Sequence, residues 1–406
     1  MTAGTRGLRR TVALVVLVMA GFLSLSPVYA GSTADFLATL TDSEAGELQT
    51  WKAARRGFEQ ELDAYWEKVD GKRQERKKKR AAKMPFVPGD YVMSLPPAYA
   101  GPKLSETLGA KYAAFLRDQE KTQPEPPKDM AVVADYLAAA KRVYGFEPER
   151  LSEKDYKRRY AEEARALGLA KDQVVRVYAL ETGGIGTYDM QAGIHPIKKT
   201  GRAISSALGY AQLLDANSVN ELSQHGSFFI DKLAQKARNP NLSAARKRAL
   251  KNKIAILKRM YANAKRVPYE WERHQSYAKT PEGMGMHVLN IDGDIGPVLQ
   301  AMKLKGLMDL AAKNGRPNLS GPEIEVMNLS GPATGLELMQ PAGLKAPVTN
   351  FFARRAYYVN KMVVGLTGEQ LLAELERRMN ESVKAQGSIE FAEAFDAVAS
   401  ARATGK

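Results

Sequence analysis

The chain has 406 residues, a formal net charge of +15 and no cysteine. Without cysteine it has no disulfide bond, no thiolate metal site and no cysteine for lipoprotein acylation. The basic balance favours anionic partners or serves solubility, but no helix-turn-helix, zinc-finger or aromatic ribonucleoprotein pattern supports nucleic-acid binding.

The first thirty residues predict a secretory signal. Three arginines precede an apolar run from Val12 to Leu25, and the segment ends in "SPVYA" at Ala30. Because the apolar run is short for a membrane span, we expect cleavage after Ala30 and a periplasmic protein; an uncleaved anchor is the alternative. The remaining 376 residues would keep a charge of +12, enough chain for about two domains or one elaborated domain.

Residues 31–150 predict a helical N-terminal region of unknown role. Apolar residues at three-and-four spacing indicate one amphipathic helix from 42 to about 80, which ends in "GKRQERKKKR". That basic end is either solvated or docks on an acidic polymer. Shorter helices are expected near 104–121 and 129–144, on either side of the linker "TQPEPPKD".

The helix signals become clearer from residue 151 onward. Ser152 is a candidate cap for a helix to about Leu167, and Asp172 for the following "QVVRVYALE". Residues 221–284 form a basic helical segment, either a hairpin or a lid over an acidic substrate. Later helices are expected near 295–312, 350–364 and 367–385, with a Thr367–Gln370 capping box, and no signal is seen after about residue 390. The expected fold is all-α.

Most chemical motifs are missing, which leaves carboxylates as candidates. The four histidines lack metal-ligand spacing, and no glycine-rich loop follows a strand, so no metal or cofactor is expected. In "ALETGGIGTYDMQAG" an apolar helix ends at Glu181 and glycines follow. The helix dipole and crowding by apolar side chains raise the pKa of such a carboxyl, which suits a general acid at the floor of a groove.

Four further blocks follow Glu181 in order. They are "SSALGYAQLL" at 205–214, "LNIDGDIGPVL" with Asn290 and Ile291, "EVMNLSGPATG" with Asn328, and "YYVNKMV" with Tyr358. Together with the Glu181 motif, this order resembles the soluble lytic transglycosylase domain, a relative of goose-type lysozyme, over about residues 155–365. The resemblance implies a lysozyme-like domain at 151–366 that contains the 221–284 insertion, with a C-terminal helix and tail at 367–406.

The resemblance also implies roles for single residues. Glu181 matches the sole catalytic acid/base, Gly209 and Gln212 match the turn that lines the sugar groove, and Asn328 matches an asparagine that contacts substrate. Tyr358 matches a tyrosine over the active site. Gly209 and Gln212 fit a plain turn equally well, and Tyr358 fits an ordinary core position equally well.

The chain also departs from the family pattern. Thr182 stands where serine is usual, Met327 replaces a tyrosine, and the long spacing from Glu181 to Gly209 indicates an extra loop at the groove.

The implied activity is non-hydrolytic cleavage of the bond between N-acetylmuramic acid and N-acetylglucosamine in peptidoglycan, with a 1,6-anhydro product. Asp189 keeps a hydrolase alternative open, because it could hold a water. A catalytically silent wall-binding or scaffold protein on the same fold is the third reading. Glycan strands are then the expected partner, and residues 31–150 could dock on an envelope assembly; the oligomeric state is not indicated.

Overall fold

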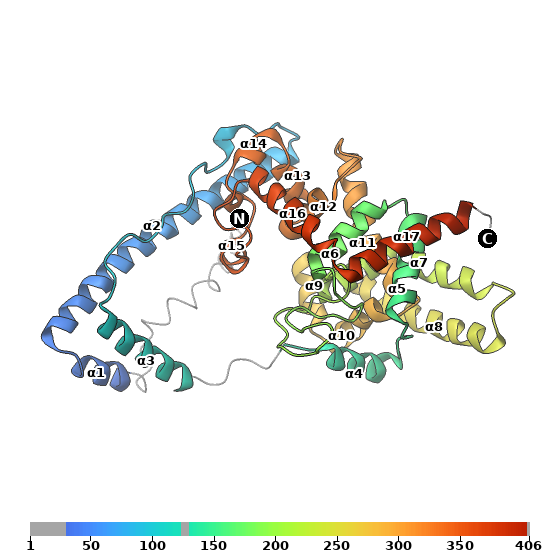
Figure 1. Ribbon diagram of the computed structural model, residues 1–406, viewed down its shortest axis with the longest axis horizontal. Helices are drawn as coiled ribbons and strands as arrows, with labels where there is room; N and C mark the ends of the chain where they lie inside the picture. Colours follow the sequence, from blue (N-terminus) through green and yellow to red (C-terminus); the bar gives the residue numbers. More distant parts are fainter. Residues whose placement is uncertain (1–29, 123–129, 404–406) are drawn as a thin grey trace, which may run out of the picture. The chain divides into compact units, whose positions relative to one another are not determined.

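The computed structural model describes residues 30–122 and 130–403 (Figure 1). The predicted secretory signal therefore lies outside the described residues, apart from Ala30. Over the described ranges the chain is helical and has no strand, only isolated bridges, which confirms the predicted all-α class. No helix in these ranges combines the length and apolar character needed to cross a membrane.

The chain divides into two compact units, one within Met1–Tyr65 and Pro96–Pro126 and the other within Trp66–Leu95 and Pro127–Lys406. This division differs from the expected boundary at residue 150. The helices of the first unit are α1 (Ala30–Ala38), the first part of α2 (Asp42–Ala81) and α3 (Glu106–Thr122). Half-buried aromatic rings hold them together: Phe36 stacks on Phe115 at 4.3 Å, and Trp51 meets the edge of Tyr112 at 5.6 Å.

The second unit holds the remaining elements. They are the end of α2, η2 (Pro88–Asp90), α4 (Val133–Tyr144), α5 (Glu153–Ala166), α6 (Lys171–Thr182), α7 (Asp215–Ala237), α8 (Ala244–Arg266), α9 (Trp271–Ala278), α10 (Pro281–His287), η3 (Val288–Ile291), α11 (Gly296–Lys313), α12 (Gly321–Ser330), α13 (Pro332–Leu338), α14 (Pro341–Lys345), η4 (Val348–Asn350), α15 (Arg354–Val359), α16 (Gly368–Ser382) and α17 (Gln386–Ala403).

Helix α6 lies in the core of this unit, against α5, α12, α16 and α17. Its predicted inward residues Val174, Val175 and Tyr178 are buried. The Tyr178 ring meets Phe391 of α17 edge to face at 5.2 Å. The helix that carries Glu181 is thus held on several sides, which fixes the position of its last turn.

Two of the three predicted caps are confirmed. The Ser152 hydroxyl accepts from the Asp155 amide at 3.1 Å, and Thr367 forms its capping box with Gln370. The cap at Asp172 was wrong, because α6 begins one residue earlier and Asp172 instead accepts from Arg176 at 2.8 Å.

The basic end of α2 is not simply a solvated helix end. Arg76 is fully buried, and its guanidinium donates to Glu337 of α13 at 2.6 Å and to the Asn350 carbonyl at 2.7 Å. Arg80 also pairs with Glu337, and Lys79 pairs with Asp90 at 2.6 Å. These three cations therefore attach the helix to its own unit, which leaves few of the basic residues for an acidic polymer.

Residues 221–284 belong to the core of the second unit, as a helical hairpin of α7 and α8 followed by α9 and α10. Leu250, Leu257 and Met260 of α8 are buried. The Lys253 ammonium pairs with the buried Asp292 at 2.7 Å. The hairpin expectation is confirmed, and these contacts make the segment part of the core rather than a projecting arm.

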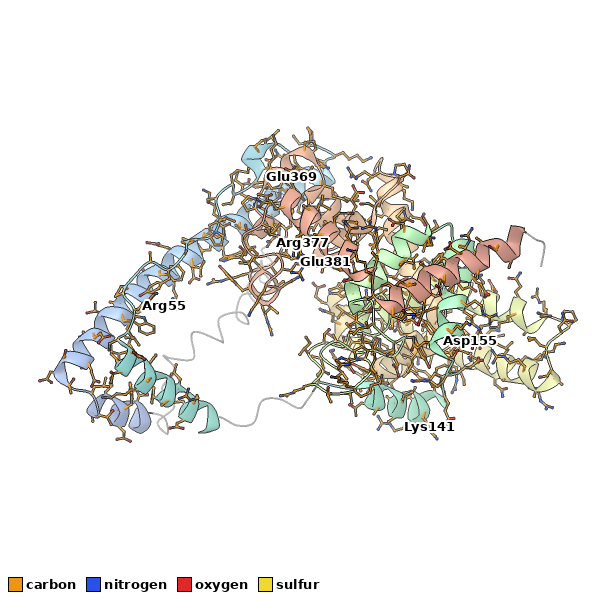
Figure 2. The ribbon with its side chains drawn as sticks, in the orientation of Figure 1. Arg55, Lys141, Asp155, Glu369, Arg377 and Glu381 are labelled. Carbon is orange, nitrogen blue, oxygen red and sulfur yellow. The ribbon has the colours of Figure 1, made fainter. Side chains whose placement is uncertain are left out.

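Two late expectations need correction. The predicted helix at 350–364 is only the short α15, because the chain turns at Asn360. The tail after residue 390 is helical through α17, whose Phe391 and Phe395 are fully buried. The neighbouring α16 carries charged pairs on its exposed side, including Arg377 and Glu381 at 2.8 Å (Figure 2).

Candidate functional site

A cavity of about 930 Å³ in the second unit contains three of the predicted site residues. The lining is formed by the end of α6, the loop before α7, α7 itself, the α8–α9 connection with the start of α9, α11, α12 and the start of α13. Its residues are Glu181, Met190, Ala192, Gly193, Ser205, Ala207, Gln212, Leu214, Asn217, Asn220, Tyr269, Trp271, Lys303, Asn328, Leu329, Ser330, Gly331 and Pro332. The volume fits the range of small-ligand sites.

Glu181 and Asn328 meet at this cavity from two different helices. Glu181 is half-buried in the last turn of α6, and the Asn328 side-chain amide of α12 donates to its Oε1 at 2.9 Å. The two residues are 147 positions apart in sequence. The close packing of α6 on α12 brings them together.

Glu325 was missed by the sequence reasoning. It lies one turn before Asn328 on α12 and is only 1% exposed. Both of its oxygens are buried without a hydrogen-bond partner in the geometry of the described chain, and its charge acts on the Glu181 carboxyl. A buried carboxylate disfavours the ionised form of a neighbouring carboxyl. Glu325 therefore favours the protonated form of Glu181.

The surroundings of Glu181 raise its pKa. Burial and then the Glu325 carboxyl raise this pKa well above the ordinary value, and the Asn328 amide acts in the opposite direction. Burial also raises the pKa of Glu325 to about 7. The direction and the part played by burial agree with the prediction for Glu181, and the Glu325 carboxyl is a further cause that was not predicted. Both shifts favour the protonated form of these carboxyls.

The glycines after Glu181 serve a turn against the C-terminal helices. Gly183 adopts φ +63° and ends α6. Gly184 has φ +70°, and a Cβ there would lie 2.3 Å from the Ser382 carbonyl of α16. The backbone freedom seen in the sequence thus lets the chain leave α6 where α16 and α17 press closely on it.

Gly209 supports the cavity indirectly, while Gln212 lines it. Gly209 has φ +77°, and a Cβ would lie 2.5 Å from the Gln300 amide nitrogen. Gln212 is itself in the left-handed region, at φ +42°, and its amide donates to the Gly209 carbonyl at 2.8 Å. The predicted extra loop also reaches the cavity, because Met190, Ala192 and Gly193 belong to its wall.

Tyr358 and Asp189 do not line the cavity. Tyr358 lies on α15, 42% exposed, with its ring 5.9 Å from Trp66. Asp189 pairs with Arg150 at 2.6 Å and with Lys199 at 3.1 Å. Burial would raise the pKa of Asp189, but the hydroxyl of Thr187 and the two cations hold it below the ordinary value. Neither residue is positioned to act with Glu181.

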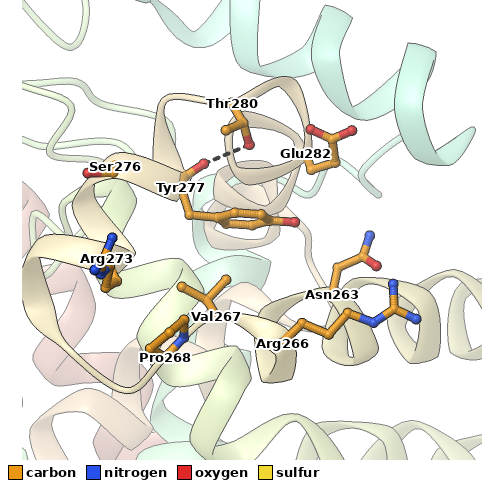
Figure 3. A pocket seen from close by; sticks show the side chains of 9 residues that line it. All are labelled: Asn263, Arg266, Val267, Pro268, Arg273, Ser276, Tyr277, Thr280 and Glu282. Carbon is orange, nitrogen blue, oxygen red and sulfur yellow. Dashed lines mark hydrogen bonds between the residues drawn. The ribbon is translucent and has the colours of Figure 1, made fainter.

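A second cavity, of about 570 Å³, lies between the end of α8 and α9 (Figure 3). The Tyr277 ring lies in its middle, and the Thr280 hydroxyl donates to the Tyr277 carbonyl at 2.7 Å. Glu282 is the single carboxylate in its lining, and no predicted site residue contributes to it. It offers no arrangement comparable to the Glu181–Glu325 pair.

In the described ranges, no cluster of three or more histidine, aspartate or glutamate side chains is arranged to hold a metal ion. His287 is fully buried, its ring hydrogen-bonded to Ser218 at 2.8 Å and to the Ser206 carbonyl at 2.7 Å. Burial lowers the pKa of His287 to about 4, so the ring is neutral and structural.

In the sequence, only its spacing from Asn328 points to Glu325. In "EVMN" it precedes Asn328 by three residues, a spacing that places both side chains on one helix face. A glutamate among apolar helix residues is common on exposed surfaces, so this spacing alone does not indicate a carboxyl pair.

Comparisons of the chain with protein families, with curated proteins and with solved structures find no match. The cavity and its carboxyl pair are therefore interpreted from their own chemistry, together with the resemblance in the sequence.

Proposed function

We propose that the protein is a lytic transglycosylase that cleaves peptidoglycan strands, with Glu181 as its single acid/base. The observation that carries the proposal is the Glu181 carboxyl in the lining of a cavity of about 930 Å³, with the Asn328 amide 2.9 Å away and with a pKa raised by burial and by Glu325. A carboxyl kept neutral near pH 7 suits the protonation of a glycosidic oxygen. The ordered blocks that resemble this family supply the substrate class.

In the first step, Glu181 protonates the oxygen between N-acetylmuramic acid and N-acetylglucosamine, and the bond to the muramic acid C1 breaks. The positive charge that develops on the sugar is stabilised by the acetamido group of the substrate. The Glu181 carboxylate left behind accepts from the Asn328 amide, 2.9 Å away.

In the second step, the Glu181 carboxylate takes the proton of the muramyl 6-hydroxyl, whose oxygen bonds to C1. Ring closure gives the 1,6-anhydro product, consumes no water and restores protonated Glu181. One carboxyl thus serves as acid and then as base: Glu325 favours its protonated form before the first step, and Asn328 supports its charged form between the steps.

The positions of the other carboxylates support this route over hydrolysis. Two-carboxylate glycosidases place their acids about 5–9.5 Å apart on either side of the sugar. Glu325 is buried and does not line the cavity, and Asp189 is held in ion pairs. Neither is placed to activate a water on the far face of a bound ring.

The blocks that suggested the family do not all lie at the cavity. The 205–214 turn and the 328–332 segment line it, which supports a lysozyme-like arrangement around Glu181. Asn290 is fully buried beneath it, and Tyr358 lies against Trp66. The proposal therefore rests on Glu181, Gln212 and Asn328. Export to the periplasm and docking through residues 31–150 are further expectations that belong to the proposal.

Purified protein incubated with peptidoglycan sacculi provides the test. Release of fragments with 1,6-anhydro ends supports the proposal, whereas reducing ends indicate a hydrolase, and bound but intact sacculi a silent wall-binding protein. Glu181→Gln keeps the side-chain volume and should abolish release without changing the melting temperature. Unchanged release by this variant would remove Glu181 from the mechanism.

A further inference from the structure

Part of the cavity lining comes from residues outside the blocks that resemble a known family. Asn220 comes from α7, Lys303 from α11, Tyr269 from the α8–α9 connection and Trp271 from the start of α9. The connection and α9 lie within the basic 221–284 segment, whose role the sequence left open. These lining residues include two aromatic rings and a cation, which is a different chemistry from the carboxyl of Glu181.

The two aromatic side chains keep much of their surface in solvent. Tyr269 is 61% exposed and Trp271 is 39% exposed. Large aromatic side chains left exposed at a cavity indicate a binding surface, because their burial would otherwise stabilise the fold. The flat faces of such rings pack well on the C–H face of a pyranose sugar.

Tyr269 is held in place although it is exposed. Its hydroxyl donates to Asn220 Oδ1 at 3.5 Å, and its ring meets His274 edge to face at 5.5 Å. Asn220 is in turn fixed by the His274 ring at 3.1 Å and by the Gln224 amide at 3.2 Å. A ring positioned in this way loses little conformational entropy when a ligand packs against it.

Lys303 supplies the only cation in the lining of this cavity. It is half-buried, and no carboxylate of the described chain lies within ion-pair distance of its ammonium. The nearest acidic influence is the buried Glu221, whose pKa burial raises to about 7 while Lys303 acts in the opposite direction. Glu221 does not line the cavity, so the Lys303 charge is available to an anion inside it.

We infer that Tyr269, Trp271 and Lys303 form a subsite that binds a sugar ring bearing a carboxylate. The rings pack on the sugar, and Lys303 binds the carboxylate. The inference rests on the proposed function and deepens it: the site prefers glycans with acidic substituents, such as the lactyl group of N-acetylmuramic acid, over neutral N-acetylglucosamine oligomers. The 221–284 segment then contributes to substrate selection.

The experiment measures equilibrium binding with the full-length Glu181→Gln protein, so that no turnover disturbs the result. Two ligands of equal length are titrated by calorimetry: a neutral N-acetylglucosamine oligomer and an alternating oligomer with N-acetylmuramic acid. We expect the acidic oligomer to bind about tenfold more tightly. Adding Lys303→Gln should remove this preference and leave the affinity for the neutral oligomer unchanged.

Lys305→Gln in the same background is the matched control. Lys305 lies two residues further along α11, pairs with Asp309 and is not in the cavity lining, so its loss should preserve the preference. Trp271→Ala should weaken both oligomers about equally, and Tyr269→Ala should do the same. Thermal melts show that each variant remains folded.

Equal affinity of the parent for both oligomers, or an intact preference in Lys303→Gln, would overturn the inference. So would an unchanged affinity in Trp271→Ala and Tyr269→Ala. These failures are distinct from failure of the proposed function. If the protein cleaves sacculi but lacks this preference, the subsite is wrong and the transglycosylase proposal is unaffected. If it binds the acidic oligomer selectively but cleaves nothing, the transglycosylase proposal is wrong and the subsite is unaffected.

Discussion

The buried Glu325 of α12 raises the pKa of Glu181, while Glu181 alone of the two lines the cavity. One carboxyl is in contact with the ligand space and the other adjusts its charge. Because Asn328 follows Glu325 by one helical turn, the same helix supplies the carboxyl that raises this pKa and the amide donor. The predictions below separate these contributions.

Glu325→Gln should shift the alkaline limb of the cleavage rate to lower pH. The substitution removes the neighbouring charge that helps to raise the pKa of Glu181, so Glu181 ionises earlier as the pH rises. The measurement is the release of labelled fragments from sacculi between pH 4 and 9. Glu325→Asp keeps a titrating partner and should move the alkaline limb less than Glu325→Gln does. Identical alkaline limbs for the parent protein and both variants would show that Glu325 does not affect the ionisation of Glu181.

Buried carboxyls also make stability depend on pH. The folded pKa values of Glu325 and Glu221 are both raised to about 7 from an ordinary 4.5. Each group's favourable contribution is therefore complete below about pH 4.5 and lost as the pH rises through 7, at a cost of up to about 3 kcal/mol per group. Urea unfolding should show a stability that falls over this range. Glu221→Gln should make the fall shallower; an unaltered slope would contradict this reading.

Asn328→Ala should lower cleavage about 10- to 100-fold. The side-chain amide donates to Glu181 at 2.9 Å, and a hydrogen bond to a charged carboxylate contributes about 1.5–3 kcal/mol. The loss should appear mainly in kcat, since it concerns the charged form of Glu181 between the two steps. Single-turnover rates on a defined glycan test this. A change confined to KM would show that Asn328 only binds substrate.

Asp189→Asn should leave cleavage and the anhydro product unchanged. The carboxylate pairs with Arg150 and Lys199 away from the cavity lining, so its loss affects the loop and not the reaction. Product analysis by mass spectrometry is the readout. A loss of cleavage comparable with that of Glu181→Gln would bring back the two-carboxylate hydrolase.

Glu337→Gln should destabilise the second unit by about 3–5 kcal/mol, because it leaves the fully buried Arg76 without its counter-charge. Glu381→Gln is the matched control: its pair with Arg377 is exposed, so its loss should cost at most about 1 kcal/mol (Figure 2). Urea denaturation of the two variants gives the comparison. Equal small losses would mean that the end of α2 is not anchored by this pair.

Much of the local structure could be predicted from short-range patterns. The Ser152 and Thr367 caps, the long α2 and the end of α6 at Glu181 all follow from neighbours within a few residues. Helix periodicity and capping depend on residues only a few positions apart, so the all-α class and most helix positions could be predicted from the sequence. The failures at Asp172 and at 350–364 are boundary errors, where tertiary packing outweighed local preference.

What the sequence by itself determined is the candidate acid, Glu181, and the turn that follows it. Only the tertiary structure decided the rest. It brought Glu325 and Asn328 to Glu181 from more than 140 residues away, placed Trp271 and Lys303 on the same cavity, and removed Tyr358 and Asp189 from it. The reason is physical: the pKa of a buried carboxyl depends on its burial and on its distance from neighbouring charges and donors, and the packing of α6 against α12 sets both.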